Sequence, residues 1–207
     1  YDKGISYLLS QIYKNINKPF RIRLSSIEVN EINDELIDII KNEKERFCHH
    51  LHIPLQSASD KVLKDMNRKY LSKDFLNKMN LLKQHFNDIS ITTDVICGFP
   101  TETDNDFDIT YNFLKDNEFA RLHVFPFSPR QGTKAYSLKQ VYKNGQSKIR
   151  TDKLLNLSKE LEQNYFKSFL GSKRKAVSLR GNKALTDNYL TIENIEKHTG
   201  IFDVEVK

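Results

Sequence analysis

Four short polar segments each follow an apolar run of the sequence, and they carry side chains suited to holding a small polar ligand. They are residues 25–28, 54–59, 98–103 and 126–133. In parallel α/β sheets and barrels, ligands bind beyond the C-terminal ends of the strands, so segments of this kind meet at one rim. We therefore expect the chemistry of this chain at that rim.

The polar side chains of the rim have defined capacities. Glu28 and Glu102 are carboxylates that can accept hydrogen bonds from an amine or from ribose hydroxyls. Gln56 and Ser57 both donate and accept. Ser59 has a structural alternative that we favour, because a serine before a helix caps its first turn.

Two further rim residues fit close contact with a ligand. Gly98 lets the backbone approach a bound group. Arg130 can form a bidentate pair with a carboxylate or phosphate, although a surface contact or a tie to a carbonyl is an equally ordinary role. Thr103 or Asp104 is expected to cap the helix that follows.

Histidines and cysteines invite a metal interpretation that we do not favour. His49, His50 and His52 alternate across a predicted strand, so packing and hydrogen bonding are the better prediction. Cys48 and Cys97 form no CxxC or CxxxCxxC spacing, and we expect both to be small buried residues without a disulfide.

Composition sets wide limits on function. The 207 residues carry a formal net charge of +6, which is compatible with a polyanionic partner without requiring one. No apolar run reaches the roughly 18 residues of a membrane span, and no signal peptide is visible. Hydrolase elbows, zinc-protease helices and glycine-rich phosphate loops are absent from the sequence.

The elements that must position the rim alternate between strand and helix. Predicted strands cover residues 20–27, 50–55, 89–97 and 121–127, and predicted helices cover 7–16, 31–41, 59–66, 72–86 and 104–116. This rhythm predicts βαβ units and a parallel sheet. No strand precedes residues 7–16, and the chain starts at Tyr1, so we expect a longer protein that begins upstream.

The pattern changes after residue 130. Residues 131–146 are a polar connector, and 147–170 form one long amphipathic helix whose apolar side starts at Ile149. Short strand-like runs follow at 176–179, 189–192 and 202–206. We therefore predict an α/β region over 1–146, a connecting helix over 147–171 and a small all-β appendage over 172–207, incomplete at its end.

Three sequence blocks resemble a known family. Residues 52–70 (HIPLQSASD, then VL and MNRKY), 93–103 (TDVICGFPTET) and 127–135 (FSPRQGTKA) are similar to the MiaB-type methylthiotransferases. Within that family, RLSSIE at 23–28 and LHVFP at 122–126 resemble the MtaB branch, which modifies threonylcarbamoyladenosine beside the tRNA anticodon. Residues 186–190 (TDNYL) resemble its RNA-binding TRAM domain.

The resemblance implies the later part of a partial (β/α)6 radical-SAM barrel followed by a TRAM-like appendage. It also implies a cytoplasmic enzyme that uses S-adenosylmethionine and two [4Fe–4S] clusters to add a methylthio group to tRNA. The cofactor-binding residues that it suggests are Ser26, Glu28, Gln56, Ser57, Ile96, Gly98, Glu102 and Arg130.

This sequence departs from the family where the catalytic cluster is held. No CxxxCxxC is present, so the cluster ligands are absent from the chain, and we expect this fragment alone to be inactive. Ala58 replaces the usual glycine and Phe127 the usual tyrosine. No catalytic residue or metal ligand is assigned.

A basic run in the predicted appendage suggests tRNA contact. It contains no acid, and its members are Lys173, Arg174, Lys175, Arg180 and Lys183. Two alternatives remain open: a tRNA-binding fragment with no activity of its own, and an unrelated (β/α) barrel enzyme.

Overall fold

The computed structural model describes residues 4–207, which divide into two compact units. The first unit contains the described residues up to His52, together with Lys78–Ser90 and Phe166–Lys207. The second contains Ile53–Asn77 and Ile91–Tyr165. The chain thus leaves the first unit and returns to it twice.

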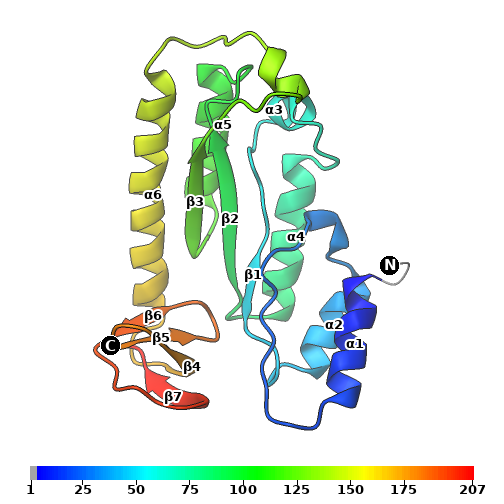
Figure 1. Ribbon diagram of the computed structural model, residues 1–207, viewed down its shortest axis with the longest axis vertical. Coiled ribbons are helices and arrows are strands. Elements are labelled where there is room, and N and C mark those ends of the chain that lie inside the picture. The colour runs from blue at the N-terminus through cyan, green and yellow to red at the C-terminus, as the bar shows by residue number, and fades with distance from the viewer. Residues whose placement is uncertain (1–3) are drawn as a thin grey trace. The chain divides into compact units, whose positions relative to one another are not determined.

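The second unit is built on parallel strands. β2 (Ser90–Cys97) pairs in parallel with β3 (Arg121–Pro126), and Figure 1 shows both arrows pointing the same way. Residues 53–56 extend the pairing on the other side of β2, where Ile53 N donates to Thr92 O and Ile96 N donates to Gln56 O, both at 2.9 Å. β2 is buried along most of its length, as parallel strands between covered faces usually are.

Helices follow these strands and supply the core of the second unit. They are α3 (Asp60–Asp65), α4 (Ser72–His85, which continues into the first unit), α5 (Asp104–Asp116), the 3-10 helix η2 (Lys134–Ser137) and α6 (Gln146–Ser168, which also continues into the first unit). Leu55, Phe75, Val95 and Leu114 are each fully buried among them. A parallel α/β fold is therefore confirmed for this part of the chain.

The expected helix caps are present. Ser59 accepts a hydrogen bond from Val62 N at the start of α3. Thr103 accepts from Asp106 N at the start of α5, and the Asp106 carboxylate accepts from the Thr103 backbone in return. Both caps anchor the first turn of a helix directly after a rim loop.

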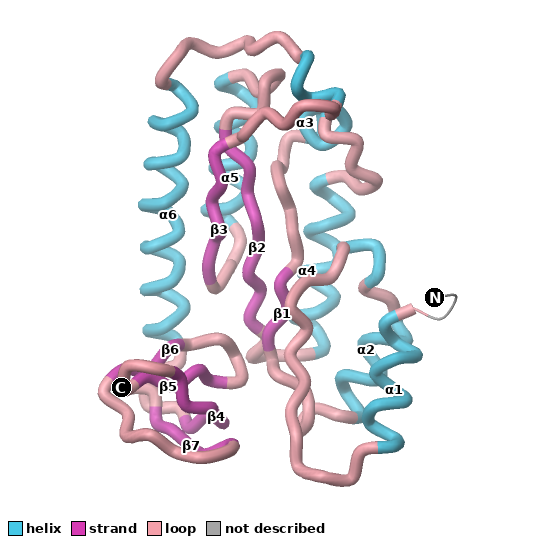
Figure 2. The backbone as a smooth tube through the Cα atoms, viewed as in Figure 1, coloured by secondary structure: helices cyan, strands magenta, loops and turns pink. Residues whose placement is uncertain are grey.

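The first unit combines helices with an antiparallel sheet. Its N-terminal elements are α1 (Ile5–Asn15), η1 (Val29–Glu31), α2 (Asp34–Asn42) and β1 (His50–His52), and Figure 1 shows α1 and α2 side by side. Strands β4 (Lys173–Leu179), β5 (Lys183–Thr186), β6 (Thr191–Glu193) and β7 (Ile201–Glu205) form a sheet in the order β6-β5-β4-β7. Figure 2 shows these four strands gathered near the C-terminus.

The structure differs from the sequence-based prediction in three places. Residues 20–27 form no strand, because the chain there pairs only at single points, such as the bridge between Ile22 and Phe47. β5 was missed because its sequence, KALT, carries a single β-branched residue. On α6, Leu154 and Leu157 are buried as predicted, but the first turn buries Arg150, which is 2% exposed, and not the predicted Ile149, which is 59% exposed.

The histidine predictions can be checked in the first unit, and the cysteine predictions in both units. His50 stacks on Tyr189 with ring centroids 4.0 Å apart, and His49 Nδ1 lies 2.7 Å from Asp88. These contacts confirm packing and hydrogen-bonding roles for both histidines. Both cysteines are free and buried, as predicted. None of the described helices is long and apolar enough to cross a membrane.

Candidate functional site at the end of strand β2

The loop that follows β2 turns sharply at its first residue. Gly98 has φ +73°, a left-handed conformation that glycine adopts without steric cost. Its N–H donates to the Glu102 carboxylate at 3.2 Å, so the loop 98–102 closes on itself. A side chain at position 98 would overlap that of Ser147. The close approach expected at Gly98 is therefore made by the chain itself.

Arg150 of α6 binds this loop through its guanidinium group. Its side chain is 3% exposed and donates to Glu102 Oε1 at 2.6 Å, to Glu102 O at 3.2 Å and to Asp104 Oδ1 at 2.8 Å. Its guanidinium lies over the rings of Phe107 and Tyr142, with centroid distances of 5.5 and 5.1 Å. One buried cation therefore ties together the loop, the start of α5 and the connector before α6.

The charge state of Glu102 reflects two opposing effects. Burial raises the pKa of its carboxyl to about 7, and the adjacent Arg150 guanidinium acts in the opposite direction. Because the pair is short and nearly fully buried, removing either partner would leave an uncompensated charge. Glu102 is thus committed to Arg150 and to Gly98 N in this structure.

The connector that precedes α6 also binds the loop 98–102. Tyr142 donates its hydroxyl to Gly98 O at 2.5 Å, and Val141 N donates to Pro100 O at 2.9 Å. Gln146 also donates its side-chain amide to Asp104. Residues 141–150 were predicted as a polar connector and the start of a helix, and they prove to be the main support of the loop.

Three of the expected cofactor-contacting residues lie beside this loop. Gln56 has φ 65° and is 7% exposed, and its N donates to Asp94 O at 2.8 Å. The Ser57 hydroxyl lies 3.1 Å from the Thr110 hydroxyl of α5. Ile96 is half-buried, and its backbone N donates to Gln56 O at 2.9 Å. Together with Gly98 and Glu102, these residues form one cluster in the second unit.

The remaining expected residues lie on exposed loops. Arg130 is exposed, and its carbonyl accepts from the Thr133 hydroxyl at 2.7 Å in a local turn. Ser26 and Glu28 belong to the first unit and are exposed, and Glu28 N donates to the Glu31 carboxylate at the start of η1. A ligand role for each of these residues remains a prediction.

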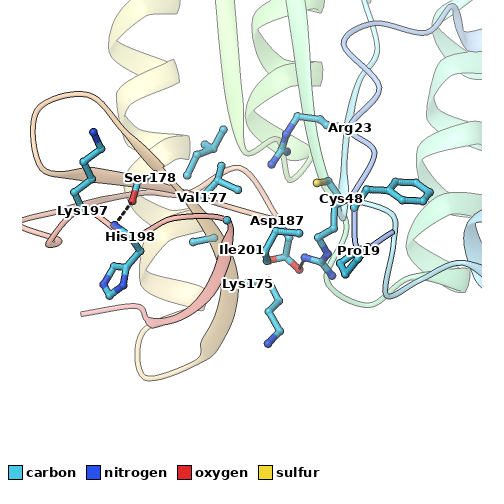
Figure 3. A pocket seen from close by; sticks show the side chains of 15 residues that line it. Pro19, Arg23, Cys48, Lys175, Val177, Ser178, Asp187, Lys197, His198 and Ile201 are labelled. Atoms are coloured by element: carbon cyan, nitrogen blue, oxygen red, sulfur yellow. Dashed lines mark hydrogen bonds and ion pairs between the residues drawn. The ribbon is translucent and has the colours of Figure 1, made fainter. Parts of the chain in front are cut away.

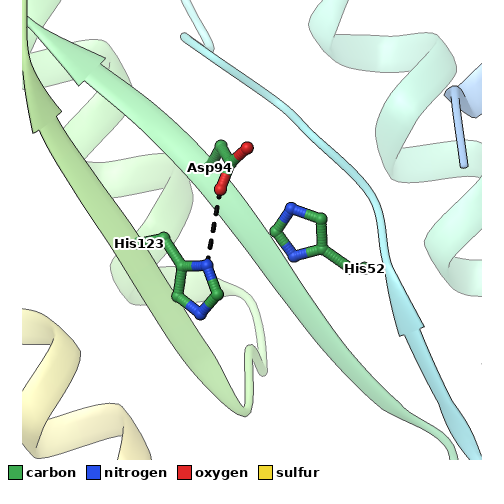
Figure 4. A group of neighbouring side chains, drawn as sticks. All are labelled: His52, Asp94 and His123. Atoms are coloured by element: carbon green, nitrogen blue, oxygen red, sulfur yellow. Dashed lines mark ion pairs between the residues drawn. The ribbon is translucent and has the colours of Figure 1, made fainter. Parts of the chain in front are cut away.

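An acid–histidine pair on the sheet was not predicted as a site. Asp94 on β2 is the register partner of His123 on β3, and His123 Nδ1 lies 3.5 Å from Asp94 Oδ1 (Figure 4). Ile96 and Phe125 are the next partners on the same face, and Phe125 is 49% exposed. Alternation along the two strands was the signal that could have revealed this polar and aromatic face.

In the structure, three residues of the predicted RNA-binding run form ion pairs and two are exposed. Arg174 donates to Asp88 at 2.6 Å and to Asp187 at 2.9 Å, and its side chain is 11% exposed. Lys175 pairs with Asp203 at 2.7 Å and Lys183 with Glu193 at 2.6 Å. Lys173 and Arg180 are exposed. Acids from other segments thus pair with three residues of a run that contains no acid itself.

The cysteines do not fit the iron–sulfur cluster that the sequence resemblance implies. Cluster ligation requires thiolates, and burial raises the pKa of Cys97 to about 12 and also raises that of Cys48. Each cysteine is free and buried, and they belong to different units. The chain contains no other cysteine, so it offers no cluster site.

Known proteins match this chain over most of its length. It is 41% identical over 181 residues to threonylcarbamoyladenosine tRNA methylthiotransferase MtaB of Thermotoga maritima, covering 86% of this chain and 42% of that protein. The MtaB of Bacillus subtilis is 40% identical over 164 residues, covering 79% of this chain and 36% of that protein. The chain thus spans less than half the length of these relatives.

Fold comparison and family assignment agree. The structure of coproporphyrinogen III oxidase (HemN) from Escherichia coli, a radical SAM enzyme, matches with a TM-score of 0.53 and 21% identity, covering 77% of this chain and 36% of that one. The family model described as the radical SAM superfamily matches residues 3–114, more than half of the sequence. The chain therefore belongs to the radical SAM superfamily.

Proposed function

We propose that this chain is the later part of a tRNA methylthiotransferase that adds a methylthio group to threonylcarbamoyladenosine. The observation that carries the proposal is the 41% identity over 181 residues to a relative of that name. The sequence blocks at 52–70, 93–103 and 127–135 support it, because they lie at and around the strand ends of the parallel sheet. The proposed cellular location is the cytoplasm.

S-adenosylmethionine is the cofactor that we assign to the rim of the second unit. When bound, it would supply radical chemistry, and we propose that the two [4Fe–4S] clusters are held by residues outside this chain. Gln56, Ile96 and the loop from Gly98 to Glu102 are the proposed contacts. Arg150 keeps that loop in shape, so its contribution to cofactor binding is indirect.

The division of the protein follows the sequence pattern. We propose a barrel portion over 1–146, a connecting helix over 147–171 and a TRAM-like β module over 172–207 that contacts tRNA. The antiparallel sheet β6-β5-β4-β7 and the exposed Lys173 and Arg180 are compatible with that role. The paired Arg174, Lys175 and Lys183 remain candidates only if RNA displaces their acidic partners.

The test uses the complete protein, purified without oxygen and loaded with clusters. It is incubated with S-adenosylmethionine, a reductant and tRNA that carries threonylcarbamoyladenosine, and the nucleosides are separated by mass. We expect the methylthio derivative of that nucleoside. Product formed only on dimethylallyladenosine would contradict the proposed substrate, because that nucleoside is in the name of a relative from Endomicrobium trichonymphae that is 39% identical over 158 residues.

A further inference from the structure

The first unit contains a cavity of about 620 Å³ that the proposed chemistry does not use. One wall is the irregular chain at Pro19–Arg23 with Cys48, and the other is the sheet with the loop before β7 (Figure 3). Its size lies within the range of about 300–1,000 Å³ that is typical of small-ligand sites. Arg23 and Lys197 border it from opposite sides.

An apolar strip crosses the sheet along this cavity. Val177 on β4 is the register partner of both Leu185 on β5 and Ile201 on β7, so the three side chains stand on one face. All three line the cavity, and Val177 and Ile201 are 42% and 41% exposed. This row of aliphatic side chains offers apolar surface that a bound group can cover.

Positive charge borders the strip. Among the described residues, four basic side chains line the cavity, and Asp187 supplies the one carboxylate. Arg21 Nη1 lies 3.1 Å from Asp187 and Lys175 Nζ lies 2.7 Å from Asp203, so these two cations already have partners. Of the described basic residues in the lining, Arg23 and Lys197 are the two without an ion-pair partner, so they can face an added anion.

The Arg23 side chain is fixed by two contacts and still has an N–H donor without a partner. Its Nη2 donates to Thr186 O at 2.7 Å, and its guanidinium lies 5.3 Å from the Tyr189 ring centroid. Its Nη1 is buried and has no hydrogen-bond partner among the described residues. Lys197 is exposed and forms no ion pair in the part of the chain that the structure describes. A buried donor without a partner costs free energy unless a ligand satisfies it.

We propose that this cavity holds one unstacked nucleotide of a single-stranded RNA segment, with the base on the Leu185–Val177–Ile201 strip and a phosphate between Arg23 and Lys197. The combination of an apolar strip with two cations fits a nucleotide, which has an apolar ring face and a phosphate, and not a free inorganic anion, which would leave the strip uncovered. The choice of RNA rests on the proposed tRNA function. The site differs from the basic run of β4 and β5, because Arg23 and Lys197 lie outside that run.

The experiment measures RNA binding by the complete protein. A fluorescein-labelled single-stranded RNA of twelve nucleotides and the same sequence as a duplex are titrated by fluorescence anisotropy at several salt concentrations. K197E is expected to weaken single-strand binding about tenfold and to lower the salt slope by about one. V177D should weaken single-strand binding about tenfold, because it replaces apolar contact by a negative charge where the base packs.

Matched controls separate the cavity from general charge and from misfolding. K41E removes a positive charge from α2, an exposed position outside the cavity, and should leave the salt slope unchanged apart from a small uniform effect. The melting temperature of each variant is compared with the wild type, and a 4-thiouridine probe is cross-linked to map its contacts. Cross-links within the cavity lining support the proposal even if V177D proves unstable.

Three results would overturn the proposal. They are equal affinities for the single strand and the duplex, K197E behaving like K41E, or inorganic phosphate alone competing as strongly as the RNA. Failure here is distinct from failure of the proposed function. The nucleoside assay reports the reaction product, whereas the titration reports only where RNA is held.

Discussion

At the scale of single residues, Arg150 contributes most to the candidate cofactor loop. It is a buried cation with three hydrogen bonds to a loop that precedes it by almost fifty residues. Removal of one partner from a buried ion pair costs about 3–5 kcal/mol, because the other charge stays buried without compensation. The loop therefore depends on a residue that no motif of the sequence indicates.

R150M is accordingly expected to lower the free energy of unfolding by about 3 kcal/mol, measured by urea denaturation. The double variant R150M/E102M should recover part of that loss, because no buried charge remains. The control is R121A, which removes the exposed 3.7 Å pair between Arg121 and Glu162 and should change stability by less than about 1 kcal/mol. Equal losses of unfolding free energy in R150M and R121A would show that the buried ion pair contributes no more to stability than the exposed pair.

A second residue-scale prediction concerns pH. The hydrogen bond that His49 donates to the Asp88 carboxylate raises the pKa of His49, so that pair stabilises the fold below about pH 6.5, the ordinary value for histidine. The contribution is lost as pH rises through the raised value. Burial alone would raise the pKa of Asp88, but His49 and Arg174 outweigh it and lower the pKa. The Asp88 contribution is present above about pH 3.9 and is lost as pH falls toward the lowered value.

Stability of the network should therefore be greatest between about pH 4 and 6.5. Urea midpoints measured from pH 4 to 9 test this. H49Q keeps a polar side chain at this position but does not titrate, so its midpoint should fall less between pH 6 and 9 than that of the wild type. Parallel curves for the two proteins would rule out the His49 contribution.

The residues that sequence reasoning identified are those with local partners. Ser59 and Thr103 could be predicted as caps because each bonds to a backbone N–H three residues ahead. Arg150 could not be predicted from its surroundings, although its spacing from Leu154 and Leu157 placed it on the buried side of the helix. Arg174 looked like an RNA contact because Asp88, its closest partner, lies 86 residues away in the sequence.

At the scale of elements, the turn that ends β2 is the most constrained piece of backbone in the site. Gly98 and Gly132 both have positive φ, at +73° and +81°, but only Gly98 has neighbours where a side chain would stand. Comparing alanine substitutions at the two glycines therefore separates two free-energy costs. One is the cost of placing alanine in a left-handed conformation, and the other is the cost of displacing neighbouring side chains.

We expect G132A to cost about 1 kcal/mol, the usual penalty for alanine in a left-handed conformation. G98A should cost at least twice as much, because the added methyl group would also displace Ser147 and Tyr142. Thermal unfolding of both variants measures the difference. If the two losses are equal, the connector moves away from Gly98 without cost.

Elements with a strong periodic pattern were predictable. The helix at 104–116 was predicted with the bounds that the structure shows, since its caps and apolar spacing agree. The strand predicted at residues 20–27 is absent from the structure. The run is rich in branched residues, which favour strands, but its backbone pairs with other segments only at isolated positions. Strand β4 begins three residues earlier than predicted, because Lys173, Arg174 and Lys175 concealed its start.

At the scale of the whole molecule, the chain contains the residues that support the candidate cofactor loop but lacks the cysteines that would bind a cluster. After anaerobic reconstitution with iron and sulfide, this chain alone should show no broad visible absorbance. Its two thiols are buried and belong to different units. The complete protein under the same treatment is the positive control. A stable cluster on the chain alone would contradict the assignment of the ligands to other parts of the protein.

The two-unit division also has a consequence for biosynthesis. Arg23 donates to Thr186, 163 residues later in the chain, so the first unit cannot close until the ribosome has made nearly the whole segment. At about 5–20 residues per second, its early residues wait about 8–30 s for their partners. The second unit is complete once residue 165 has been made, so it can fold before the first unit receives its last segment, residues 166–207. A stalled or prematurely terminated nascent chain would therefore present Arg21, Arg23 and Cys48 without the strands that normally cover them, which makes this segment a candidate for chaperone protection during translation.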